Sequence, residues 1–108
     1  MNYTRVSSDM AELLPVGAAI QTTVSTAATA IASAAQIAAR SGARYALVQA
    51  QGADLRYTID GATTPVGGAT GLLLANGASV ILRKEVLSAF SGIRNASTDV
   101  TAVVQFLG

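Results

Sequence analysis

Alternating apolar and polar positions predict short β-strands through most of the second half of the chain. Residues 55–59 place Leu, Tyr and Ile at every second position, which is the pattern of a strand with one buried face. Apolar residues also occupy positions 100, 102, 104 and 106, so we expect the last strand over 99–107. Residues 44–51 are mostly apolar on both alternating sides, which predicts a strand in the centre of a sandwich.

Residues 20–40 carry two conflicting signals. The stretch 20–31 is rich in Thr, Val and Ile, which favour a pleated strand. From residue 27 to residue 40 the density of alanine favours a helix instead. We therefore expect a strand to about residue 31, then a short helical turn around 34–40 that ends at Ser41-Gly42.

Turn residues separate the remaining apolar stretches at 71–74, 79–83 and 87–93, which we expect to be strands. Asn76-Gly77 is the strongest hairpin signal, because both residues tolerate the positive φ of a type I′ turn. The turn at residues 52–54 likewise predicts a hairpin. Seven or eight short strands at this regular spacing predict an all-β fold, a small antiparallel β-sandwich or jelly-roll-like fold.

The first residues of the chain form a separate segment in this interpretation. We expect residues 1–17 to be an N-terminal arm and residues 18–108 to be the β-sandwich domain, because Pro15 and Gly17 close the first segment. The apolar residues of the arm partly follow helical spacing; they are Tyr3, Val6, Met10, Leu13 and Leu14. Two interpretations stay open for this arm: a frayed terminus or a segment that docks on a neighbouring subunit.

The amino-acid composition excludes several kinds of functional site. The 108 residues are 51% hydrophobic and only 12% charged, and cysteine and histidine are absent. A disulfide scaffold and a thiolate metal site are therefore excluded, and the commonest general base is missing. Asp54 and Asp60 flank one expected strand, but both lie at turns, where Asp is favoured on local grounds. We expect no catalytic residue, no cofactor and no bound metal.

Charge also bears on the possible partners. No run of basic residues is present, so we expect no binding to nucleic acid. Residues 13–39 carry no charge, but Pro15, Gly17 and many Thr and Ser interrupt them, so we expect no membrane span. Residues 1–10 lack the pattern of a signal peptide. Arg44 and Arg56 lie on or beside expected strands and are candidate partner contacts, although ordinary surface arginines would explain them equally well.

Five segments of the chain carry a resemblance to a known group of proteins. They are a Thr/Ala-rich first strand, a strand that begins after arginine and ends in Gln, a short strand ending near Asp-Gly, a Leu-rich hairpin bounded by glycines, and a Phe-Ser-Gly-Ile-Arg run: residues 22–31, 43–49, 55–61, 71–77 and 90–94. Through these segments, residues 23–108 resemble small all-β structural proteins of tailed bacteriophages. Such proteins are commonly capsid decoration (cement) proteins or accessory parts of the head, neck or tail.

The resemblance implies a structural protein of the virion. We expect a capsid decoration protein that binds and stabilises the lattice of the major capsid protein, or another virion protein, at the capsid surface after synthesis in the host cytoplasm. We also expect a homo-oligomer, with a trimer as the working assignment. The alternative is a tail, fibre or neck accessory protein with a receptor- or partner-binding role. The candidate partner-binding residues are Tyr3, Val6, Met10, Leu13, Leu14, Arg44 and Arg56.

Overall fold

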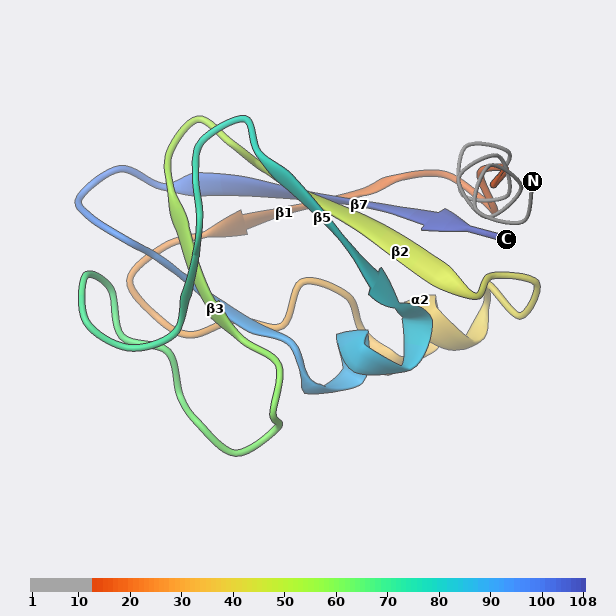
Figure 1. Cartoon of the computed structure of the whole chain (residues 1–108), viewed down its shortest axis with the longest axis horizontal. Helices are drawn as coiled ribbons and strands as arrows, with labels where there is room; N and C mark the ends of the chain where they lie inside the picture. Colours follow the sequence, from red (N-terminus) through yellow and green to blue (C-terminus); the bar gives the residue numbers. More distant parts are fainter. Residues whose placement is uncertain (1–12) are drawn as a thin grey trace, which may run out of the picture.

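The computed structural model describes residues 13–108, in which seven strands form two antiparallel sheets (Figure 1). The four-stranded sheet has the order β1-β7-β2-β5, and the three-stranded sheet has the order β4-β3-β6. The strands are β1 (Ile20–Val24), β2 (Tyr45–Gln51), β3 (Leu55–Thr58), β4 (Leu72–Leu74), β5 (Ser79–Arg83), β6 (Ser91–Arg94) and β7 (Val100–Leu107). The all-β fold class expected from the sequence is confirmed.

Strands β7 and β2 form the centre of the larger sheet, as the apolar pattern of residues 44–51 predicts. Their inward residues alternate with outward ones, and the inward positions are fully buried. In the antiparallel register, Ala46 lies opposite Phe106 and Val48 lies opposite Val104. Because alanine is small, the alanines beside these larger side chains let the three-stranded sheet pack closely on this one.

The second sheet contributes to the same hydrophobic core. Leu55, Tyr57 and Leu74 point inward from β3 and β4 and are buried. The ring of Tyr57 stacks on the ring of Phe90, with centroids 4.9 Å apart and planes 3° from parallel. One core therefore lies between two sheets, which is the arrangement of a β-sandwich.

The conflicting signals of residues 20–40 are resolved by a short strand and a short helix. The helical turn is confirmed as α2 (Ala34–Ala38), which begins at a capping box between Ser33 and Gln36. The strand is shorter than expected, because the chain leaves β7 at Val24, opposite the first residue of that strand. It then crosses to the other sheet, where Thr29 and Gly92 exchange two backbone hydrogen bonds of 2.8 Å.

Both expected hairpins are wrong, because each turn carries the chain from one sheet to the other. Strand β4 pairs with β3, whereas β5 pairs with β2, and β2 and β3 also belong to different sheets. The turn at Ala75–Ala78 has positive φ only at Gly77 (85°), as in a type II turn, not at both central residues. The expected strand over 87–93 is a 3-10 helix, η1 (Lys84–Ala89), followed by β6.

The two connections support each other at one end of the sandwich. The Gly52 N–H donates to the Asn76 side-chain oxygen at 3.0 Å. The Asn76 N–H in turn donates to the Asp54 carboxylate at 2.8 Å. Asp and Asn are therefore favoured at these turns because their side chains replace backbone partners across the gap between the two connections.

The chain just before β1 extends the larger sheet. Leu14 and Gly108 exchange backbone hydrogen bonds of 3.2 and 2.9 Å, and the Val16 N–H donates to the Phe106 carbonyl at 2.8 Å. Leu14–Val16 therefore lie beside the end of β7. Tyr3, Val6 and Met10 lie outside the described residues. Within residues 13–108, no helix has the length and apolar character needed to cross a membrane.

Candidate interaction site

The structure brings two of the expected partner-binding residues to one end of the larger sheet. Leu14 is 68% exposed and pairs with Gly108 on one side of β7. Arg44 is exposed on the other side, where its N–H donates to the Leu107 carbonyl at 2.8 Å. Leu13, the residue before Leu14, is half-buried. Residues 30 positions apart in the sequence thus flank the same strand end.

Arg56 lies apart from them, on the three-stranded sheet. Its guanidinium donates twice to the Asn95 side-chain oxygen, at 3.1 and 2.9 Å, and once to the Gly71 carbonyl at 3.1 Å. The same Asn95 oxygen accepts the Gly68 N–H at 3.0 Å. Arg56 therefore connects the loop before β4 to the end of β6, and a partner-binding role for it stays a prediction.

Three cations gather around a cleft at the Arg44 end of the sheet. Arg44, Arg83 and Lys84 line a cavity of about 460 Å³, together with Tyr45 and Glu85. The Lys84 ammonium donates to the Arg40 carbonyl at 3.2 Å. Three of the seven basic residues of the chain thus lie beside one acidic residue, which makes this corner weakly positive.

The side of the larger sheet that faces away from the core is almost free of charge. We call it the outer face; it consists of Gln21, Thr23, Tyr45, Leu47, Gln49, Gln51, Ser79, Ile81, Arg83, Thr101, Val103, Gln105 and Leu107. Arg83, at one corner, is its only charged residue. The second sheet, α2 and η1 all lie on the opposite side, so no described element covers this face (Figure 1).

A second apolar surface lies on the smaller sheet. We call it the β4 edge; it consists of Val66, Leu72 and Leu73, which are 49%, 53% and 50% exposed. Strand β4 is the outermost strand of its sheet. Beside it is a mainly apolar cavity of about 290 Å³, whose lining includes Tyr57, Ile59 and Leu72.

The two acidic residues that flank β3, Asp54 and Asp60, form hydrogen bonds within their own turns or with the neighbouring turn. The Asp60 carboxylate accepts the N–H groups of Ala62 and Thr63 and the Thr63 hydroxyl, and these bonds lower the pKa of Asp60 to about 2. Asp54 accepts the Asn76 N–H. Both bonding patterns are those of turn residues, as the sequence predicts.

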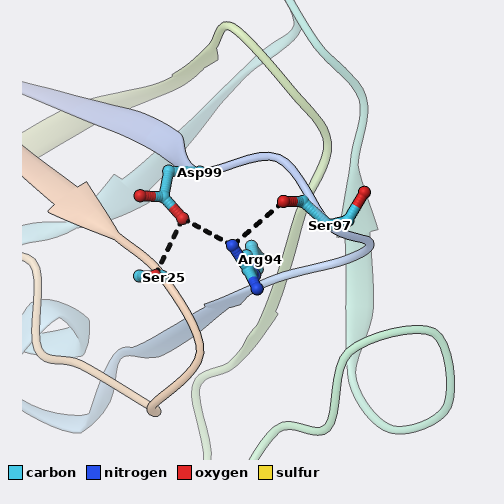
Figure 2. Close-up of polar contacts among 4 residues, drawn as sticks. All are labelled: Ser25, Arg94, Ser97 and Asp99. Carbon is cyan, nitrogen blue, oxygen red and sulfur yellow. Dashed lines mark hydrogen bonds and ion pairs between the residues drawn. The ribbon is translucent and has the colours of Figure 1, made fainter.

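Sequence reasoning missed one charged cluster, which Figure 2 shows. The Arg94 guanidinium donates to the Asp99 carboxylate at 2.8 Å and to the Ser97 carbonyl at 3.0 Å. The Ser25 hydroxyl donates to the same carboxylate oxygen at 2.8 Å. These contacts, the Ser25 bond first, lower the pKa of Asp99. The opposite charges of Arg94 and Asp99, five positions apart, were the available signal in the sequence.

Comparison of the chain with protein-family models, with curated proteins and with solved structures finds no match.

Proposed function

We propose that this protein is a structural, non-catalytic component of a tailed-phage virion, and that it binds the major capsid lattice as a decoration protein. The outer face of the four-stranded sheet is the observation that carries this proposal. It presents residues of four paired strands, is nearly uncharged, and is not covered by any described element. The virion context comes from the resemblance of residues 23–108 to small all-β phage proteins.

The composition of the outer face favours a protein partner. About a quarter of the residues of an average soluble domain are charged, whereas this face has one charge at its margin. The cores of protein–protein interfaces are depleted in charge and enriched in aromatic residues, and Tyr45 lies on this face. A sheet held by long-range pairing is also a rigid platform, so little conformational entropy is lost when a partner binds.

The termini of the described chain add a second element to this proposal. Leu14 and Arg44 lie on either side of the end of β7, at one end of the same sheet. An arm of residues 1–14 that binds a neighbouring subunit would therefore start beside the outer face. This is the docking interpretation of the arm, one of the two that the sequence leaves open, and a contact of this apolar kind should persist when the salt concentration is raised.

Binding of the recombinant protein to phage particles that lack it tests the proposal. Ile81 is 44% exposed on the outer face, so Ile81→Glu places a charge there with little effect on the core. The matched control is Ala35→Glu, which adds the same charge at an exposed position of α2, on the opposite side of the sheet. We expect Ile81→Glu to weaken particle binding at least tenfold and Ala35→Glu to bind as the unaltered protein does.

Equal binding by both variants and the unaltered protein would contradict the outer face as the docking surface. A further variant without residues 1–12 separates the arm from the face, since it leaves the Leu14–Gly108 pairing in place. We expect this variant to bind more weakly while it keeps the unfolding temperature of the complete chain. Binding to tails instead of heads would favour the alternative, a tail, fibre or neck accessory protein.

A further inference from the structure

We propose that the β4 edge is a self-association site, at which β4 of a second copy pairs antiparallel with β4 about a twofold axis. The two three-stranded sheets then become one continuous six-stranded sheet. This contact is distinct from the outer face and does not depend on a particle, so it goes beyond the proposed function. The four sheet edges differ in how open they are to pairing with another strand.

Two of the other three edges are protected in ways that natural sheets use to avoid pairing with other chains, and the third is polar. The edge of β6 is covered, because Thr29 exchanges two hydrogen bonds with Gly92 and the Ser25 carbonyl accepts the Arg94 N–H at 3.2 Å. Strand β5 carries a charge at Arg83. Strand β1 contains Gln and Thr at its three central positions.

The β4 edge is short, which is one such protection, but it is neither charged nor covered by a described segment. The strand is Leu72–Leu74, without a charge, a proline or a polar residue. Within residues 13–108, its backbone pairs only with β3, so the N–H and C=O groups on its other side have no protein partner. Unpaired backbone groups beside exposed leucines form a template for a further strand.

A second copy of the same strand fits this template by symmetry. Antiparallel pairing centred on Leu73 places Leu73 opposite Leu73 of the second copy and Leu72 opposite Leu74 of the second copy. No like charges meet across such a pair, because the strand is uncharged. Leu72 and Leu73 are half exposed in the single chain and both become covered. Since Leu72 also lines the apolar cavity beside β4, the pairing reduces the exposed apolar surface there too.

The small area of the β4–β4 contact implies that the dimer is weak. A strand of three residues covers much less than the roughly 1,200–2,000 Å² of a stable protein–protein interface. We therefore expect a weak dimer in solution, with a dissociation constant of about 0.1–1 mM. Copies held close together by another attachment would pair much more readily, because the effective concentration of a linked partner is in the millimolar range.

Sedimentation of the complete chain over a range of concentrations tests this inference. We expect monomers at about 20 μM and a growing dimer fraction toward about 2 mM, the range that a dissociation constant of this size requires. Leu73→Lys should abolish the concentration dependence. The control Ile81→Lys changes a similarly exposed residue, 44% against 50%, on the edge strand of the other sheet, and should dimerise like the unaltered chain.

The twofold register gives a sharper test. Because position 73 faces itself, Leu73→Lys and Leu73→Glu should each remain monomeric, while an equimolar mixture should form a mixed dimer with opposite charges in contact. Dimerisation of Leu73→Lys alone, a mixture that stays monomeric, a trimer in place of a dimer, or an unaltered chain that is monomeric throughout would each overturn the proposal. No particle is present in these measurements, so their outcome is independent of the particle-binding result.

Discussion

Gly71 and Gly77 form a matched pair of positions at which the pairing of β3 with β4 can be tested by stability. Both glycines have positive φ, 114° at Gly71 and 85° at Gly77. A Cβ atom at Gly77 would meet nothing within 4 Å, whereas a Cβ atom at Gly71 would lie 2.7 Å from the Tyr57 carbonyl oxygen. Both Gly→Ala substitutions therefore place a Cβ atom at a positive φ, and only Gly71→Ala adds close contacts, with Tyr57 and Arg56.

The structure sets the size of each effect. Gly77→Ala should lower the free energy of unfolding by about 1–2 kcal/mol, the cost of a left-handed conformation for a residue with a Cβ atom. Gly71→Ala adds a collision with backbone, which only a shift of β4 away from Tyr57 relieves. That shift also disturbs the hydrogen bond from Arg56 to the Gly71 carbonyl. We expect a total loss of about 3–4 kcal/mol for Gly71→Ala, a large share of the stability of a domain of this size.

Thermal and urea unfolding followed by circular dichroism measure both variants. For a domain of about this length, each 1 kcal/mol lowers the unfolding temperature by about 4–8 °C. Gly71→Ala should therefore unfold at least about 4 °C below Gly77→Ala. Gly77→Val should lower the free energy of unfolding by about 1–3 kcal/mol, the usual cost of a residue held in a strained backbone conformation. Equal losses at the two glycines would refute the close approach of residue 71 to β3.

Three further substitutions test the side-chain contacts of Arg56, Asp60 and Arg40. Arg56→Ala should lower the free energy of unfolding by about 1–3 kcal/mol in urea titration, because the bonds to Asn95 and Gly71 are lost; an unchanged midpoint would mean that Arg56 is free to serve a partner. Folding lowers the pKa of Asp60 from 3.8 to about 2. The ionised carboxylate of Asp60 therefore stabilises the fold fully above pH 3.8, and this stabilisation is lost as the pH falls toward about 2. Asp60→Asn should flatten the fall in unfolding temperature over that interval, and an identical pH profile would contradict the bonds at this turn. Arg40→Met should cost about 1–2 kcal/mol by calorimetry, since the guanidinium lies 5.0 Å from the centre of the Phe106 ring and bonds two carbonyls; a more stable variant would show that burying this cation outweighs its contacts.

Local sequence patterns predicted where the strands of this protein lie better than they predicted which strands pair. Alternation located the strands at 55–58 and 100–107, because a half-buried strand shows its two faces in its own sequence. The turn at Asn76-Gly77 was also located, since its residues favour a turn by themselves. Whether a turn joins two paired strands or sends the chain to another sheet depends on contacts far along the chain. The hairpin expected there was wrong for that reason.

The candidate surfaces also differ in how far the sequence alone predicts them. The nearly uncharged outer face follows from residues 45–51 and 100–107, whose outward positions are uncharged in the sequence. Leu14 and Arg44 are brought together only by pairing with the end of β7, which neither residue signals locally. The β4 edge requires the strand order, because an apolar strand such as Leu72–Leu74 could equally lie in the middle of a sheet. The internal hydrogen bonds of Arg56 likewise depend on a residue 39 positions away.

The composition of purified phage particles tests the central proposal most directly. The proposed function requires that a phage genome encodes this chain; particles of that phage can be purified, their proteins quantified by mass spectrometry, and this protein located with gold-labelled antibody. For a decoration protein we expect a fixed ratio of this protein to the major capsid protein and labelling over the surface of the head. Absence of the protein from purified particles would contradict a virion role, and labelling confined to the tail would contradict decoration of the capsid.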